Sequence, residues 1–145
     1  ASYPRVSADG RYLFYTWSAY GTFPVWHSEA DLRMIDLHTM EPVDVSIWND
    51  EDEADSYHSW SSDGRWVLFG SRRQDGRYTR LYLAYFDRDG HPHKPFLLPQ
   101  KDPGFYHKTL FTFNVPDFTK EKVDFKTRTA YREAFSDERI QLTVR

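Results

Sequence analysis

Short apolar runs recur along the chain, and turns built from Asp and Gly separate them. The clearest example spans residues 57–99, where Asp63-Gly64, Asp75-Gly76 and Asp89-Gly90 divide four runs. Asp-Gly between apolar runs is a strong hairpin signal, because Gly accepts a positive φ and Asp hydrogen-bonds back to the turn. The pattern predicts a four-stranded antiparallel meander, with strands at 57–60, 65–72, 80–87 and 94–98.

Two of these strands are apolar at consecutive positions rather than at alternate ones. Residues 66–69 are Trp-Val-Leu-Phe, and residues 81–86 are Leu-Tyr-Leu-Ala-Tyr-Phe. A sheet with one wet face alternates apolar and polar residues, so these strands indicate a sheet that is buried on both faces. A sheet between two neighbouring sheets is the geometry of a β-propeller blade.

The N-terminal part of the chain repeats this unit. Residues 3–15 align with residues 57–69 without a gap, and Tyr, Ser, Asp, Gly and Arg coincide. Residues 32–37 align with residues 81–86, and the pattern predicts first-copy strands at 3–6, 11–17, 31–37 and 42–48. Repeats of about 40–50 residues with four strands each are typical of propellers. We therefore expect an all-β fold of antiparallel four-stranded propeller blades.

The expected organisation is a propeller part over residues 1–116, followed by a tail. The blade repeats cover about 3–54 and 57–99, and a terminal strand lies within 106–114 (its apolar residues predict 108–114). Because propellers have about 4–8 blades, two blades do not close a ring. We expect the chain to be a partial ring or fragment, or to complete the ring by self-assembly.

Residues 117–145 are charged and lack the repeat, so they form a C-terminal tail or the start of a further domain. Residues 119–135 show helical spacing. Ile140, Leu142 and Val144 alternate with polar residues, which predicts a strand.

These motifs carry a family resemblance. Ser-x-Asp-Gly-Arg, an apolar strand, a polar turn and a Leu-x-Leu or Leu-x-Met strand resemble the WD-repeat-like propeller blade of the TolB-like family. The likeness covers about residues 3–118. Residues 56–61 and 94–99 resemble the TolB-like propeller proteins of Bacteroidetes-type bacteria. The resemblance implies a periplasmic or outer-membrane-associated protein whose blades bind or scaffold other molecules.

Composition excludes some classes of function. The net charge of −3 over 145 residues gives no basic excess, so duplex nucleic acid is a poor partner. No apolar run approaches the ~20 residues that span a bilayer. The chain has no cysteine, so it has neither disulfides nor thiolate metal ligands. Aromatic residues make up 18% of the chain, which suits sheets that stack through large flat side chains.

Candidate partner-binding residues lie in three places. A long connection over residues 18–30 is rich in aromatic side chains, which either form a binding lip or fold back over a sheet edge. The first strand of the second repeat would line a propeller channel, although a lone His is more often structural. The turn over residues 71–78 is basic. The candidates are Tyr20, Phe23, Trp26, Tyr57, His58, Arg72, Arg73 and Tyr78.

Residues 49–55 contain five carboxylates. Asp50, Asp52 and Asp55 are calcium candidates, because clustered oxygens suit a hard cation, but the Gly of a calcium loop is absent. The alternative is a solvated acidic loop. A second hypothesis pairs this loop with Arg72 and Arg73 of the basic turn through guanidinium–carboxylate contacts. No other cofactor is indicated.

The expected function is a non-catalytic propeller module that binds or scaffolds a protein or peptide in the cell envelope. The sequence contains neither a Gly-x-Ser-x-Gly elbow nor a paired catalytic constellation, so it does not favour an enzyme. The alternative is a carbohydrate-active enzyme or a sugar-binding protein. Glycosidase chemistry needs two carboxylates about 5–10 Å apart, and Glu53 and Asp55 are the available pair.

Overall fold

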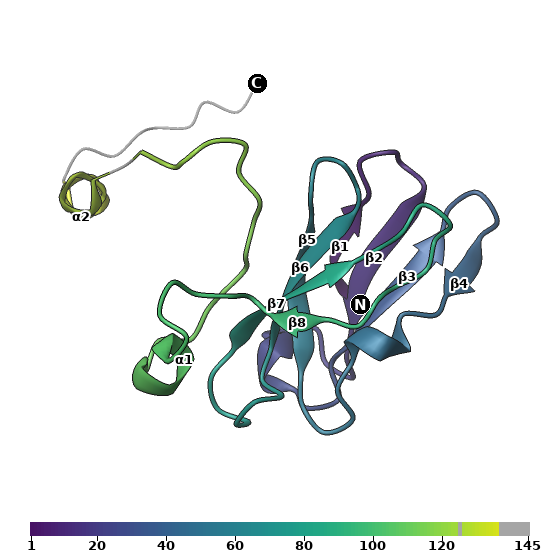
Figure 1. Cartoon of the computed structure of the whole chain (residues 1–145), viewed down its shortest axis with the longest axis horizontal. Helices are drawn as coiled ribbons and strands as arrows, with labels where there is room; N and C mark the ends of the chain where they lie inside the picture. The colour runs from purple at the N-terminus through teal and green to yellow at the C-terminus, as the bar shows by residue number, and fades with distance from the viewer. Residues whose placement is uncertain (125, 137–145) are drawn as a thin grey trace.

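Two antiparallel sheets and their connections occupy residues 2–97 of the chain in the computed structural model, which describes residues 1–124 and 126–136 (Figure 1). Sheet 1 consists of β1 (Ser2–Val6), β2 (Tyr12–Trp17), β3 (Asp31–Asp36) and β4 (Glu41–Val43). Sheet 2 consists of β5 (Asp55–Trp60), β6 (Trp66–Ser71), β7 (Arg80–Tyr85) and β8 (Phe96–Leu97). Each strand pairs with the next along the chain, so both sheets are meanders. The all-β class and the two four-stranded meanders are confirmed.

The Ser-x-Asp-Gly motif builds the same turn in both sheets. Ser7 donates to the carboxylate of Asp9 at 2.6 Å, and Ser61 donates to that of Asp63 at 2.5 Å. Each serine also accepts the amide at the start of the following apolar run. The glycine of each motif has a positive φ, 76° in the first turn and 66° in the second, which only glycine adopts without strain. These turns therefore follow from local chemistry.

The first strand of each sheet, β1 or β5, has a β-bulge at the equivalent position. The register of β1 with β2 shifts between Ser2 and Arg5, and that of β5 with β6 shifts between Ser56 and Ser59. Tyr3 and Tyr57 lie in these bulges with φ values of 53° and 54°. Their rings meet edge to face at 4.8 Å, so one bulge packs on the other.

The fourth strands are shorter than predicted. Residues 42–48 were expected to be extended, but β4 ends at Val43 and Ser46–Trp48 form a 3₁₀ helix. This turn carries Trp48 into the space between the sheets, where it is fully buried. The Asn49 side chain then takes the place of the missing strand, since it accepts from the Leu32 amide at 2.8 Å and donates to the Leu32 carbonyl at 3.0 Å. In sheet 2 a strand was predicted at 94–98, but only Phe96–Leu97 (β8) forms one.

The predicted terminal strand within 106–114 is wrong. The short helix α1 (Phe105–Lys108) occupies its start, and the residues after it belong to neither sheet. The Arg80 guanidinium binds the carbonyl oxygens of residues 106, 109 and 111, which a neighbouring strand would otherwise use. A single backbone hydrogen bond, from Phe113 to Thr79 at 3.0 Å, links this segment to the start of β7.

The tail contains one described helix, α2 (Thr127–Ala134), inside the range where helical spacing was predicted. The strand predicted from Ile140, Leu142 and Val144 lies outside the described residues. Among the residues that the structure describes, no helix has both the length and the apolar character needed to cross a membrane.

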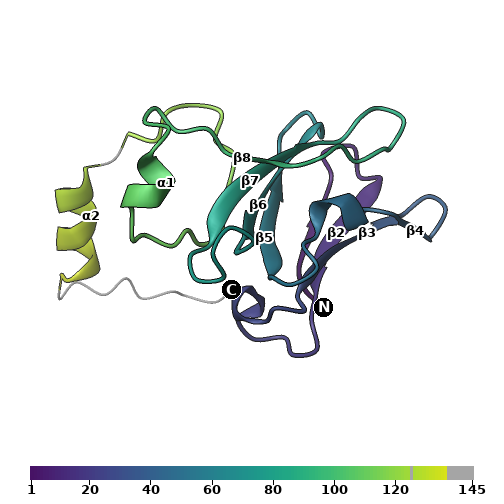
Figure 2. The ribbon, with the colours of Figure 1, turned by 60° about the horizontal axis from the view of Figure 1, so that its bottom comes forward.

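The two sheets pack face to face, and the core lies between them (Figure 2). Aromatic rings dominate this interface. Phe14 meets Trp48 at 5.4 Å, and Tyr12 meets Phe86 at 4.9 Å, both edge to face. The Trp48 indole also donates to the His93 carbonyl at 2.8 Å, which ties the two halves together. The buried core consists of Tyr12, Phe14, Leu32, Met34, Val45, Trp48, Val67, Phe69, Ala84 and Phe86.

Candidate functional site

The aromatic loop between β2 and β3 presents its rings to solvent. Its 3₁₀ helix, Pro24–Trp26, buries Pro24 and Val25 against the fold and leaves Trp26 outside. Tyr20, Phe23 and Trp26 are 63%, 64% and 65% exposed. The rings therefore do not fold back over a sheet edge, and they are exposed to solvent as a binding lip would require.

Arg72 joins this loop to the basic turn between β6 and β7. Its guanidinium carbon lies 4.8 Å from the centre of the Trp26 ring, which is a cation–π contact. One guanidinium nitrogen donates to the Gly76 carbonyl, and Nε is buried without a hydrogen-bond partner. Within the described part of the chain, Arg72 forms no ion pair with a carboxylate. We call Tyr20, Phe23, Trp26 and Arg72 the aromatic–arginine surface.

Arg73, the next residue, points inward instead. Its guanidinium pairs with Asp55 at 2.6 Å and donates to the Trp48 carbonyl at 2.5 Å. The same group lies over the Tyr82 ring at 4.7 Å. Asp55 has no exposed surface, and its burial raises its pKa to about 6 although Arg73 opposes the rise. The predicted pairing of the acidic loop (residues 49–55) with the basic turn is thus confirmed for Arg73 and wrong for Arg72.

This pairing bears on the hypothesis that the acidic loop (residues 49–55) binds calcium. Asp55 already accepts the Asp50 amide at 2.6 Å and the Arg73 guanidinium, and it does not reach solvent. Asp52 is exposed, and only its amide contacts Asp50, at 3.2 Å. The structure does not bring the three predicted calcium candidates together as one ligand set. Glu53 and Asp55 likewise form no accessible pair of carboxylates.

A different acidic group lies in the turn after β7, and sequence analysis did not combine its members. Asp87, Asp89 and His91 are the described residues close enough to share an ion. Asp87 accepts the amides of Asp89 and His91, both at 2.9 Å. The amide of His91 is the main cause that lowers the pKa of Asp87 to about 2. These hydrogen bonds within the turn explain why the three side chains lie close together, without a bound ion.

Tyr57 and His58 do not line an open channel, so that expectation is corrected. They are 4% and 1% exposed, because β5 packs against sheet 1. The His58 ring lies 4.1 Å from the Phe14 ring, and its Nε2 is 3.0 Å from the Phe14 carbonyl. Burial lowers the pKa of His58 to about 4, so the ring is neutral at pH 7 and Nε2 carries the donated proton. His58 therefore joins the sheets.

Tyr78 lines a separate hollow of about 260 Å³ between the basic turn and α1. Arg80 lies over the Tyr78 ring at 4.9 Å and is only 2% exposed. Tyr106 contributes the opposite wall, and its hydroxyl donates to the Leu98 carbonyl at 2.9 Å. Sequence analysis missed Arg80 and Tyr106, because their role depends on a contact across about 26 residues.

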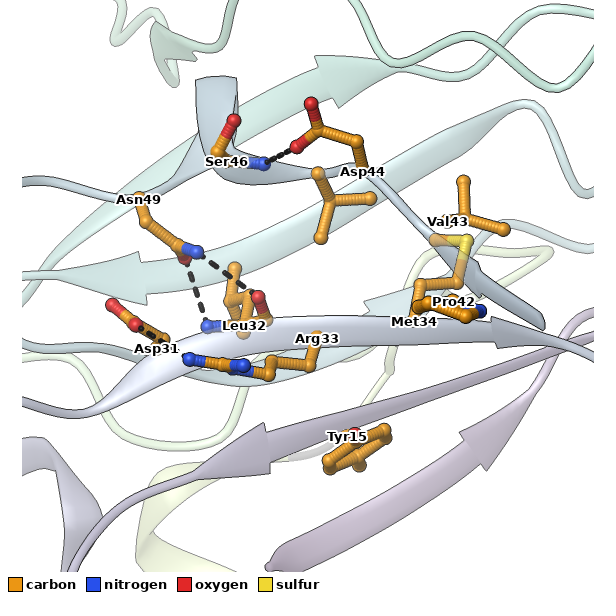
Figure 3. Close-up of a pocket in the computed structure, with 11 residues that line it drawn as sticks. Tyr15, Asp31, Leu32, Arg33, Met34, Pro42, Val43, Asp44, Ser46 and Asn49 are labelled. Atoms are coloured by element: carbon orange, nitrogen blue, oxygen red, sulfur yellow. Dashed lines mark hydrogen bonds and ion pairs between the residues drawn. The ribbon is translucent and has the colours of Figure 1, made fainter.

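A larger hollow, of about 400 Å³, lies where β4 ends and leaves part of the β3 edge uncovered. Figure 3 shows Asn49 reaching the backbone of Leu32, with Asp31 and Arg33 along β3 and Tyr15 on the neighbouring strand. Asp31 and Arg33 form an ion pair at 3.5 Å. The early end of β4 creates this hollow, so the sequence pattern did not predict it.

Comparisons of the chain with protein families, with curated proteins and with solved structures gave no match.

Proposed function

We propose that the chain is a non-catalytic binding module of the β-propeller type, in which each sheet is one blade. It binds a protein or peptide segment through the aromatic–arginine surface. The observation that carries this proposal is the stacking of Arg72 on Trp26 beside two further exposed rings. Trp, Tyr and Arg are the residues most enriched at binding hot spots. Two sheets of equal strand order packed face to face support the blade assignment.

The chemistry of this surface indicates the kind of segment it binds. No described carboxylate neutralises the Arg72 guanidinium, although one of its nitrogens donates to Gly76 and Nε is buried, and the neighbouring rings offer flat apolar area. A guanidinium forms strong charge-assisted hydrogen bonds with a carboxylate. A peptide with an acidic residue beside an apolar one satisfies both features. The loop is well suited to binding because the sheets hold its two ends.

The cell envelope is the proposed location, and it rests on the TolB-like resemblance of the sequence. Fractionation of cells that express the full-length protein tests this location. Recovery in the cytoplasmic fraction contradicts it.

Sugar binding is the second candidate, because exposed aromatic rings also stack on sugar faces. A hydrolytic version is disfavoured, since Asp55 is enclosed by the Arg73 contact and does not reach a substrate. The two candidate functions differ in whether ligand binding requires Arg72. An acidic peptide depends on its guanidinium, whereas a neutral sugar stacks on Trp26 without it.

The test is selection of peptides from a random display library on the chain, followed by titration of the enriched peptides. We expect acidic–apolar peptides, and we expect Trp26→Ala and Arg72→Ala to raise their Kd about 30-fold, the loss typical of a 2 kcal/mol hot spot. Tyr131→Ala is the matched control, because Tyr131 is an equally exposed ring on α2, at 67%.

Two results contradict the proposal. One is a library that yields no peptide dependent on Trp26. The other is a panel of neutral glycans that binds the chain and loses affinity with Trp26→Ala but not with Arg72→Ala. The second result supports the sugar-binding candidate instead.

A further inference from the structure

Each sheet has one face in the core and one face directed away from it. Successive residues of a strand point to opposite faces, so the core positions identify both sets. In β2 the core residues are Tyr12 and Phe14, and Leu13 and Tyr15 therefore point outward. In β6 the core residues are Val67 and Phe69, so Trp66 and Leu68 point outward.

The sequence alignment shows that the two sheets do not use equivalent faces in the core. Phe14 of sheet 1 aligns with Leu68 of sheet 2, but Phe14 lies in the core and Leu68 on the outer face. Conversely, Phe69 in the core aligns with Tyr15 on the outer face of sheet 1. The sheets therefore pack front to back, like successive members of a stack. A front-to-back interface leaves an unused front at one end and an unused back at the other.

The unused front belongs to sheet 2 and is apolar. Trp66 meets the rings of Tyr85 at 5.1 Å and Phe96 at 6.4 Å, which forms a continuous aromatic row across three strands. None of the side chains on this face is charged. Its members are Trp66, Leu68, Leu81, Leu83, Tyr85 and Phe96, and we call them the front face.

The unused back belongs to sheet 1 and includes Leu13, Tyr15, Trp17, Asp31, Arg33 and Ile35, which we call the back face. Its one cation, Arg33, pairs with Asp31 at 3.5 Å and lies over the Trp17 ring at 4.9 Å. The core interface already contains a similar arrangement, in which Arg73 lies over Tyr82. An arginine held on an aromatic ring is thus compatible with packing against a second sheet.

We propose that the front face of one chain docks on the back face of a second copy of the same chain. The contact between sheet 1 and sheet 2 in the core is an example of the same front-to-back packing. In sheet 1, the residues equivalent to Trp66, Leu68, Leu81 and Leu83 are Tyr12, Phe14, Leu32 and Met34, and all four are buried against the back of sheet 2. The second copy repeats that interface. This inference is independent of the aromatic–arginine surface, which lies on loops rather than on either outer face.

Front-to-back docking has a consequence that a symmetric dimer lacks. Each added copy presents a new front or back, so association continues until a ring closes or an open stack grows. Contiguous apolar surfaces that no other part of the described chain covers are typical of interaction sites.

The test measures the mass of the chain by light scattering on a sizing column over a concentration series. We expect masses above a single chain. We also expect Leu83→Lys, which blocks the front face, and Ile35→Lys, which blocks the back face, to give single chains. An equimolar mixture of the two variants retains one intact front and one intact back, so it should form a dimer and stop there.

Several outcomes overturn the proposal. A wild-type chain that remains single at every concentration shows that copies do not fill these faces, and that a flanking segment or another partner is required. A single-face variant that still dimerises alone shows that like faces meet. A mixture that stays single shows that these two faces do not meet. Trp26→Ala should leave every mass unchanged.

Folding of the variants is checked by far-UV circular dichroism. Where a lysine inside a sheet prevents folding, Phe96→Lys replaces Leu83→Lys and Trp17→Lys replaces Ile35→Lys. Phe96 and Trp17 are 43% and 42% exposed, so a lysine there reaches water without disturbing the core. The mixing experiment is then repeated with this pair.

Discussion

Replacement of Arg73 by Met should destabilise the chain strongly at pH 7.5 and much less at pH 5. Arg73 is the ion-pair partner of Asp55, which is entirely enclosed. Removing one partner of a buried pair leaves an uncompensated charge and costs about 3–5 kcal/mol. At pH 5 the unpaired carboxyl can take up a proton, so only the lost hydrogen bonds remain, at about 1–2 kcal/mol.

The direction of the pH effect follows from the pKa of Asp55. Burial raises it from 3.8 to about 6, so the folded chain binds more protons than the unfolded chain between these values. The contribution of Asp55 to stability therefore falls as the pH rises through that window, by about 3 kcal/mol in wild type. Loss of the Arg73 charge raises the pKa further and extends the window upward.

The assay is urea denaturation at both pH values. Arg72→Met is the matched control, because Arg72 has no carboxylate partner among the described residues and loses only its contact with Trp26 and its hydrogen bond to the Gly76 carbonyl. Addition of Asp55→Asn to Arg73→Met should recover stability at pH 7.5, since the amide carries no charge. If Arg73→Met unfolds the chain at pH 7.5, transfer to pH 5 should refold it. Equal losses for both arginines, or a loss independent of pH, would refute the reasoning.

Three further predictions concern single residues. His58 has a pKa lowered from 6.5 to about 4 by burial, so its contribution to stability falls by about 3 kcal/mol as the pH drops through that range; His58→Gln should remove this slope from pH-dependent urea midpoints. Gly76→Ala should cost about 1–2 kcal/mol in thermal unfolding, because φ is +66° and the new Cβ lies 2.6 Å from Glu53, whereas Gly21→Ala has open space and should be neutral. Trp48→Phe should cost about 2 kcal/mol, since it leaves a cavity in the core and loses the indole hydrogen bond between the two halves; an unchanged urea midpoint contradicts this role.

The sequence alone determined the hairpins and the class of the fold. Ser, Asp and Gly within four residues satisfy one another's hydrogen bonds and supply the positive φ, so the turns at residues 7–10 and 61–64 require no distant contact. Strands on either side of such turns are apolar enough to pair with each other. The aromatic loop and the basic turn were also identified from composition, because both lie between strands.

The tertiary structure decided which of those residues are accessible. Arg72 and Arg73 are identical and adjacent in sequence, yet one stacks on an exposed Trp26 and the other is held against Asp55. His58 appeared accessible from its strand position, but β5 packs against sheet 1 and buries it. The outcome depends on which face of a strand meets the other sheet, and a pattern that is apolar at consecutive positions does not encode that choice.

The predicted terminal strand shows the same limit most clearly. Residues 110–115 have the apolar character of a strand, and local propensity alone supports that prediction. Arg80 lies about thirty residues earlier, and its guanidinium donates to the carbonyl oxygens of residues 106, 109 and 111, so this stretch lies against Arg80 and joins neither sheet. Local chemistry therefore fixes turns and strands, whereas the partners of buried charges are fixed only when distant parts of the chain meet, because a charge without a partner is too costly to enclose.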